Sequence, residues 1–142
     1  MYPCVECNKI KLSENIETVA RMLHADHKIM CAVIKGFCAD DGVMEILEDS
    51  SCDWLASSRI EDLAKLKTKK TRLLIRLSQP CEIKEVVASS EVSFESECNT
   101  ILLLQEEAKR QNKTHGVILA IDMGDLREGI FYKFLNEIEE TS

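Results

Sequence analysis

The chain has 142 residues, and its 18 basic and 25 acidic side chains give it a formal net charge of −7. This length favours a single domain, and a hydrophobic content of 45% is sufficient for a packed core. The acidic balance argues against nucleic-acid and anionic-membrane partners, because both usually require a basic face.

Strand-like and helix-like segments alternate along the chain. The first expected element is an amphipathic helix, with Ser13 as its N-cap and an apolar stripe of Ile16, Val19, Ala20 and Leu23. Compact apolar runs then predict five buried strands, separated by helical patterns. The expected strands are 28–34, 52–56, 72–77, 92–94 and 115–122, and the expected later helices are 43–47, 60–66, 82–88, 97–111 and 131–138.

This alternation predicts an α/β fold in which helices cover a parallel sheet. No linker or low-complexity stretch divides the chain, so residues 1–142 are expected to form one domain. Two architectures fit the pattern, namely an open doubly wound sheet and part of a (β/α)₈ barrel. A complete barrel typically needs about 250 residues. Five strands in 142 residues therefore predict an open sheet or a barrel interrupted a little past halfway.

The distribution of cysteine and histidine predicts a reduced protein without a metal site. Seven scattered cysteines form no disulfide framework and are expected to be buried thiols of a cytosolic protein. The Cys4–Cys7 pair lacks a second ligand pair nearby, and His24, His27 and His115 do not cluster. The chain contains no bilayer-length apolar run and begins without signal-peptide features, so a cytoplasmic location is expected.

The first position suited to chemistry is Lys35, which directly follows the apolar run 28–34. Catalytic groups of α/β folds lie at the carboxyl ends of parallel strands. Partial desolvation there lowers the pKa of an amine and favours the neutral nucleophile that bonds to a carbonyl carbon. Gly36 lets the backbone approach a bound ring closely. The competing interpretation is a solvated loop lysine.

The second position is the segment 121–129, which follows the most apolar predicted strand. It combines two glycines, several carboxylates and Arg127. Such a segment can present the guanidinium group to an anionic oxygen. The alternative is a charged loop without a ligand.

These segments together resemble the alanine racemase N-terminal domain family, and within it the ornithine racemase-like branch. The resemblance depends on Lys35 in a KG-x-C-x-D stretch, on the run Ser58-Arg59-Ile60, and on HGVILAIDMGDLREGI at 115–130. These motifs follow one another in the family's order through nearly the whole chain. GDLREGI is the most distinctive of them.

The resemblance implies a pyridoxal-phosphate (PLP) protein built on a (β/α)₈ barrel, of which this chain covers the first five or so βα units. Lys35 matches the lysine that bonds covalently to PLP and serves as one of two acid/base groups. Arg127 lies about where the family has an arginine that hydrogen-bonds the phenolic oxygen of the cofactor. The implied reaction inverts the Cα centre of a small amino acid, as in ornithine or alanine racemases.

Several parts of the family pattern have no counterpart in these residues. The later strands, whose loops bind the cofactor phosphate, and the second acid/base group are missing, and Ala39 stands where alanine racemase proper has a tyrosine. The chain is thus expected to be a truncated product, a piece completed by a second chain, or a remnant that binds PLP weakly or not at all. An open barrel edge predicts self-association or poor solubility of the isolated chain.

Two further function classes stay open at this point. A PLP-homeostasis protein of the single-domain barrel type binds the cofactor at the same lysine without turnover. A non-catalytic interaction module of the doubly wound type makes no use of Lys35. Cofactor binding separates the module from the other two classes. Turnover of D- and L-amino acids separates a racemase from a homeostasis protein.

Overall fold

The computed structural model describes residues 4–141, in which helices and parallel strands alternate. The strands are β1 (Cys31–Val33), β2 (Trp54–Ser57), β3 (Thr71–Leu77), β4 (Val92–Glu95) and β5 (Gly116–Leu119), followed by the short β6 (Ile121–Asp122) and β7 (Ile130–Phe131). The α-helices are α1 (Lys9–Ala25), α2 (Asp41–Asp49), α3 (Ile60–Lys65), α4 (Ile83–Ser89), α5 (Cys98–Arg110) and α6 (Leu135–Thr141). Two 3₁₀ turns, η1 (Lys35–Phe37) and η2 (Pro80–Glu82), follow β1 and β3.

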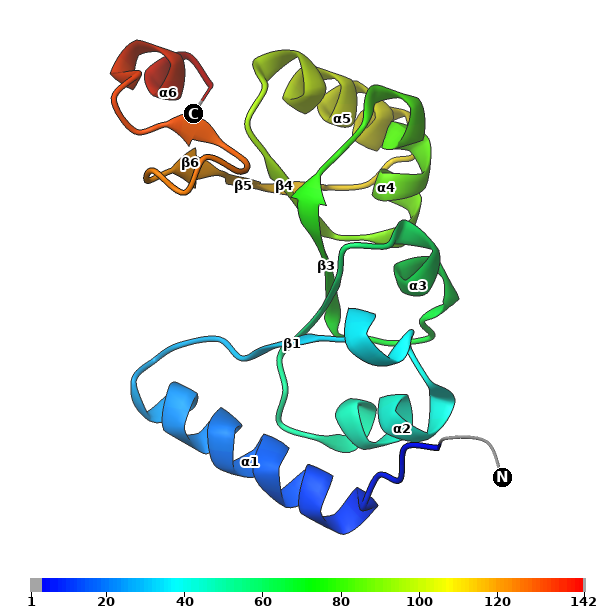
Figure 1. Cartoon of the computed structure of the whole chain (residues 1–142). Coiled ribbons are helices and arrows are strands. Elements are labelled where there is room, and N and C mark those ends of the chain that lie inside the picture. Colours follow the sequence, from blue (N-terminus) through cyan, green and yellow to red (C-terminus); the bar gives the residue numbers. More distant parts are fainter. Residues whose placement is uncertain (1–3, 142) are drawn as a thin grey trace.

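The order of the strands decides between the two architectures that the sequence leaves open. Strands β1 to β5 are all parallel and lie side by side in chain order. A doubly wound sheet reverses its strand order at a switch point, whereas a (β/α)₈ barrel keeps the chain order throughout. Figure 1 shows α2, α3, α4 and α5 stacked along one side of this sheet. The fold is therefore the first part of a barrel-type α/β structure.

The hydrophobic core lies between the sheet and these helices, in two clusters. One cluster centres on Leu74 of β3 and is closed by apolar residues of α3, α4 and α5, including Leu63, Val86 and Leu104. The other surrounds Leu55 of β2, where Ile34 and residues of α1 and α2 meet. Fully buried aliphatic side chains each contribute roughly 1.5–3 kcal/mol to folding. The packing of the helices against the sheet therefore holds the strands, and with them the strand ends, in place.

The prediction of five fully buried strands is wrong at both edges of the sheet. Val33 of β1 is 47% exposed, and Val117 and Ile118 of β5 are 37% and 38% exposed. Each edge strand has a hydrogen-bonded neighbour on one side only within the described sheet. The predicted strand 115–122 is also interrupted, because Ile121 and Asp122 pair with Ile130 and Phe131 instead of continuing β5.

The two ends of the chain also depart from the sequence prediction. Helix α1 begins at Lys9 and is capped by Asn8, whose side chain accepts a hydrogen bond from the Lys11 amide at 3.0 Å. Ser13, the predicted N-cap, lies inside this helix, and Val19 of the predicted stripe is 45% exposed. The predicted helix 131–138 starts only at Leu135, since Phe131 belongs to β7.

The expectation of buried cysteines is wrong as well. Only Cys52 is a buried residue; the other six cysteine residues are exposed, and all seven are free of disulfide bonds. The reason is that most of them lie in turns, at helix starts or on the edge strand, and only Cys52 faces a core cluster. In residues 4–141, no helix combines the length and the apolar composition needed to cross a membrane.

Candidate functional site

The local structure after β1 places Lys35 at the carboxyl end of an edge strand. Ile34 is completely buried, and its amide donates to the Ala56 carbonyl at 2.8 Å, so the strand is anchored up to this residue. Lys35 then begins the one-turn helix η1, while Cys38 and Ala39 adopt left-handed backbone angles. The turn ends at Asp40, whose carboxylate caps α2 through the amides of Gly42 and Val43. The lysine is thereby held on a short, firmly anchored turn.

The side chain of Lys35 is exposed, so the partial desolvation expected from the sequence at this strand end is not found in the described residues. Within residues 4–141, its ammonium group makes no ion pair or hydrogen bond. A Cβ atom added at the neighbouring Gly36 would meet no other atom within 4 Å, so the space beside the lysine is open. A free amine beside open space at the end of a parallel strand is the arrangement that a covalent cofactor requires.

Arg59 and Arg76 organise the loops next to this lysine. The Arg59 guanidinium lies 3.7 Å from the Cys38 Sγ atom on the β1 loop and 4.0 Å from Asp62. Arg76 donates a hydrogen bond from Nε to the Ser58 carbonyl at 2.8 Å and forms a bidentate ion pair with Glu82. The ends of β1, β2 and β3 are thus tied together by arginine side chains.

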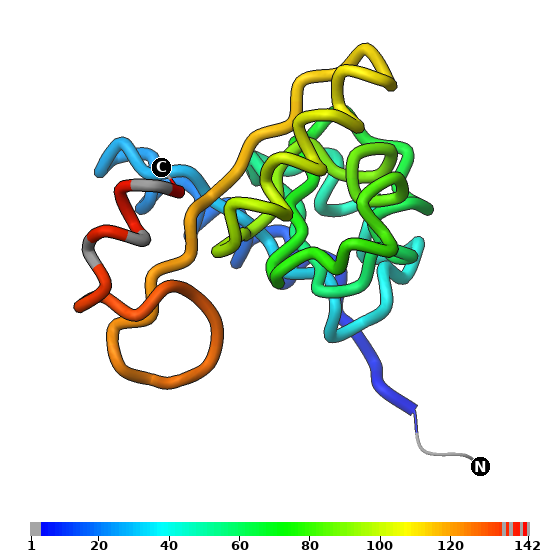
Figure 2. Tube along the Cα trace, turned by 90° about the horizontal axis from the view of Figure 1, so that it is seen from above, coloured from blue at the N-terminus to red at the C-terminus, as the bar shows by residue number. Residues whose placement is uncertain are grey.

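Arg127, the second predicted site residue, lies on a loop that leaves the sheet after β5. Figure 2 shows this loop as a closed ring that stands away from the helical layer. The Arg127 side chain is exposed, and no partner for it is found in the described part of the chain. A Cβ atom added at Gly124 of the same loop would also meet nothing within 4 Å. The guanidinium group is therefore available for an anionic oxygen.

Lys35 and Arg127 share one end of the sheet but do not touch. Both follow the carboxyl ends of parallel strands, yet β1 and β5 are the two opposite edges of the five-stranded sheet. Among the described residues no hydrogen bond or ion pair joins the two side chains. A ligand that contacts both must bridge the space between the first and fifth strands.

A buried carboxylate at the same end of the sheet was not singled out from the sequence. Glu95 at the end of β4 is 1% exposed and accepts hydrogen bonds from the hydroxyls of Ser78 at 2.5 Å and Ser93 at 2.7 Å. The Ser93 hydroxyl also lies 3.0 Å from Nε2 of His115, whose pKa is lowered by burial. The signal was present in the sequence, because Ser93 and Glu95 are two apart in a strand and share a face.

The residues present fit one part of a PLP site. The Lys35 amine suits the aldehyde carbon of the cofactor, and the Arg127 guanidinium suits its phenolic oxygen. No glycine-rich phosphate loop of the GxGxxG or GxxxxGK[ST] type occurs in the sequence. Groups suited to the reactive end of the cofactor are therefore present, whereas a phosphate-binding motif is not recognisable in the sequence.

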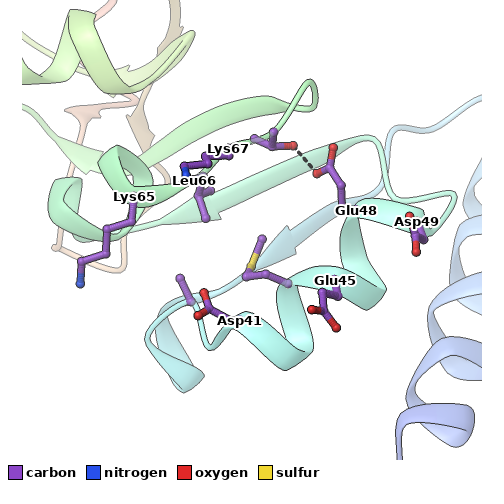
Figure 3. Close-up of a pocket in the computed structure, with 10 residues that line it drawn as sticks. Asp41, Glu45, Glu48, Asp49, Lys65, Leu66 and Lys67 are labelled. Atoms are coloured by element: carbon purple, nitrogen blue, oxygen red, sulfur yellow. Dashed lines mark hydrogen bonds between the residues drawn. The ribbon is translucent and has the colours of Figure 1, made fainter.

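A groove on the outer side of the molecule is separate from this region. It has a volume of about 690 Å³ and lies between α2 and the segment that connects α3 to β3. Figure 3 shows the carboxylates of Asp41, Glu45 and Glu48 on the α2 side, opposite Lys65 and Lys67. Neither Lys35 nor Arg127 lines this groove. Since it lies in the helical layer, away from those side chains, we do not assign the chemistry to it.

Comparison with known protein families gives a match over almost the entire chain. The family described as "Alanine racemase, N-terminal domain" matches residues 8–141. An ornithine racemase of Acetoanaerobium sticklandii is 36% identical over 132 residues, which is 92% of this chain and 37% of that protein. A lysine racemase of Thermotoga maritima is 26% identical over 144 residues, which is 99% of this chain and 41% of that protein. The chain thus spans well under half the length of these relatives.

Solved structures show the same architecture. An alanine racemase of Clostridium difficile 630 in complex with cycloserine superposes with a TM-score of 0.74 at 20% sequence identity. The match covers 94% of this chain and 38% of that structure. A second alanine racemase structure from the same organism gives a TM-score of 0.70. These matches confirm the prediction of an incomplete barrel, because this chain corresponds to only part of each structure.

Proposed function

Because this chain belongs to the alanine racemase N-terminal domain family, we propose that it provides the lysine-bearing part of a PLP-dependent amino-acid racemase. The observation that carries the proposal is the free, exposed amine of Lys35 at the carboxyl end of β1. Within the described residues this amine has no ion-pair or hydrogen-bond partner to displace when it bonds to a ligand. Other exposed lysines such as Lys65 and Lys67 share that property, and Lys35 differs from them by its place at the carboxyl end of a parallel strand.

In this proposal each site residue has a definite task. Lys35 bonds covalently to the cofactor and, once released by the substrate, moves a proton at the Cα atom of the amino acid. Arg127 binds the phenolic oxygen of the cofactor through its guanidinium group and orients the ring. PLP, when bound, supplies an electron-withdrawing ring that stabilises the negative charge left at Cα. The reaction also needs a second acid/base group on the opposite side of the substrate, and we assign that role to no residue of this chain.

The proposed substrate is a small amino acid. The two curated relatives are named for ornithine and lysine, which share an amine at the end of an aliphatic side chain. An acidic chain suits a cationic side chain, because its field attracts positive charge. We therefore place the basic amino acids first among the substrates to be tested. A cytoplasmic location is part of the same proposal and is supported by seven unpaired cysteines.

The test is a titration of the purified chain with PLP, followed by visible absorbance. Wild-type protein is expected to develop the yellow band of a lysine-bound cofactor, and Lys35→Ala is expected to lose it. Lys28→Ala is the matched control, because Lys28 lies just before the same strand and pairs with Asp26 at the surface. Equal bands in wild-type protein and the Lys35→Ala variant would refute the assignment of Lys35.

Turnover separates racemisation from cofactor binding alone. D- and L-ornithine, lysine and alanine are offered to the PLP-loaded chain, and the change in optical rotation is followed. Racemisation of any of them that disappears in Lys35→Ala supports the racemase proposal. A yellow band without turnover favours a chain that binds the cofactor at Lys35 and depends on further residues for catalysis.

A further inference from the structure

The loop that carries Arg127 is closed at its base by backbone hydrogen bonds. The amide of Ile130 donates to the carbonyl of Ala120 at 2.9 Å, and the amide of Tyr132 donates to the carbonyl of Asp122 at 2.9 Å. These bonds join the outgoing segment β6 to the returning segment β7 as a short parallel pair. Residues 122–129 therefore form a ring whose two ends are held together, as Figure 2 shows.

Gly129 makes this closure sterically possible. Its φ angle is +117°, a value that residues with a side chain rarely adopt. A Cβ atom at this position would lie 2.8 Å from both the Ala120 carbonyl oxygen and the Asp122 amide nitrogen. The returning segment thus passes so close to the outgoing one that only glycine fits without a backbone shift.

Asp122 holds the interior of the ring. Its Oδ1 atom accepts hydrogen bonds from the amides of Gly124 at 2.7 Å and Leu126 at 3.2 Å. The residue is only 7% exposed, although it sits in a loop of mostly exposed residues. The Gly124 amide, together with other hydrogen bonds from the loop, lowers the pKa of this carboxyl group. Asp122 is accordingly an ionised acceptor at neutral pH.

This arrangement explains why Arg127 is unpaired in an acidic loop. Asp125 and Glu128 are close in sequence, and a flexible segment would let their carboxylates neutralise the guanidinium group. Because the Leu126 amide, one residue before Arg127, is bound to Asp122, the backbone direction at Arg127 is fixed. Among the described residues the guanidinium group has no ion-pair partner.

We propose that Asp122 is a positioning residue, which together with Gly129 holds the 122–129 loop so that Arg127 is kept free for the cofactor. The statement that Arg127 binds the cofactor rests on the proposed function. The role of Asp122 in holding the loop rests on the hydrogen bonds alone.

The first arm of the test measures the loop without any cofactor. Amide hydrogen exchange at Gly124 and Leu126 is expected to become roughly tenfold or more faster in Asp122→Ala, because a charged acceptor of two amides is lost. Asp122→Asn keeps the Oδ1 acceptor and is expected to restore part of the protection. Glu128→Ala removes a carboxylate from the same loop and should leave exchange unchanged. Equal protection in wild-type protein and Asp122→Ala would overturn the proposal.

The second arm measures the coupling of Asp122 to Arg127 through PLP. Asp122→Ala and Arg127→Ala are each expected to raise the PLP dissociation constant, followed by absorbance. If Asp122 acts through Arg127, the double variant is expected to bind PLP no more weakly than Arg127→Ala alone. If the fold-losses in PLP affinity of the two single variants multiply in the double variant, Asp122 acts independently of Arg127, and the positioning role is overturned.

The two arms separate this inference from the proposed function. A folded wild-type chain that takes up no PLP refutes the proposed function and, with it, the ligand of Arg127. Amide exchange in that case still decides whether Asp122 holds the loop. Retained PLP binding with unchanged exchange in Asp122→Ala would instead leave the proposed function standing and remove the role of Asp122.

Discussion

At the scale of single residues, the charged groups at the strand ends are of two kinds, those paired with another side chain and those left unpaired within the described residues. Arg76 and Glu82 are both partly buried and bind each other through two hydrogen bonds. Lys35 and Arg127 are exposed and unpaired within residues 4–141. The contrast supports the proposed roles of Lys35 and Arg127, which rest first on the family motifs that contain them.

The Arg76–Glu82 pair predicts a specific pH dependence. The Arg76 guanidinium lowers the pKa of the Glu82 carboxyl group. A carboxyl group with a lowered pKa stabilises the folded state above its unfolded pKa of about 4.3. This contribution is lost as the pH falls through the folded value. Glu82→Gln is expected to reduce the free energy of unfolding by about 1–2 kcal/mol at pH 7 and by less at pH 3. Urea denaturation at both pH values measures it, and an equal loss at both would contradict the assignment.

Cys31 is expected to react slowly with alkylating reagents. Although the residue as a whole is exposed, its thiol is partly buried beside Cys52, and this raises its pKa to about 11 from an ordinary value of 9.0. A rise of about two units in the pKa reduces the thiolate fraction at pH 8 about a hundredfold, and only the thiolate reacts. Alkylation by iodoacetamide, followed by mass spectrometry, measures the rate, with the exposed Cys81 as the comparison. Equal rates at the two cysteines would contradict the cause given for the shift.

At the scale of elements, the helices are held by the side chains that they place against the sheet. Leu104 of α5 is 1% exposed and belongs to the cluster around Leu74, whereas Leu102 of the same helix is 50% exposed. Leu104→Ala is expected to reduce the free energy of unfolding by about 2–5 kcal/mol, because it leaves a cavity. Leu102→Ala, with the same change in chemistry, should stay within about 0.5 kcal/mol of wild type. Chemical denaturation compares the two, and similar losses would contradict the core described above.

Elements with a strong local signal could be predicted from the sequence, and those that depend on distant contacts could not. Strand β3 and helix α5 were expected within one or two residues of their bounds, because their apolar patterns are periodic and local. The start of α1 was predicted too late, since Ile10 in its first turn is 71% exposed and outside the apolar stripe, and only the cap at Asn8 marks the start. The pairing of Ile130 with Ile121 depends on a ring closed by Gly129, which no periodicity reveals.

The site was predicted more from resemblance than from physical pattern. A lysine after an apolar strand is a weak signal by itself, and the sequence motifs of the family directed attention to Lys35 and Arg127. The sequence could not show that both side chains are unpaired, because that depends on which carboxylates the fold brings near. The spacing of Ser93 and Glu95 could be seen in the sequence, but the contact of Glu95 with Ser78 could not, because it depends on the fold bringing these two residues together.

At the scale of the whole molecule, the sheet has two open edges, and this predicts self-association. Val33 on β1 and Val117 and Ile118 on β5 are all more than one-third exposed. Strand edges with exposed apolar side chains tend to pair with other chains unless a charge prevents it. Ile118→Lys is therefore expected to lower the sedimentation-average mass at high concentration. Leu102→Lys adds the same charge on α5, away from the edge, and should change it little. A wild-type chain that stays monomeric at all concentrations would contradict this prediction.

Covalent binding of PLP to Lys35 is best tested by locating the lysine to which the cofactor is attached. PLP-loaded protein is reduced with borohydride, digested, and mapped by mass spectrometry. We expect a phosphopyridoxyl mass on the peptide that contains Lys35 and little on exposed lysines such as Lys65 and Lys67. A folded chain with no label, or with label spread evenly over its surface lysines, would refute the attachment of PLP to Lys35.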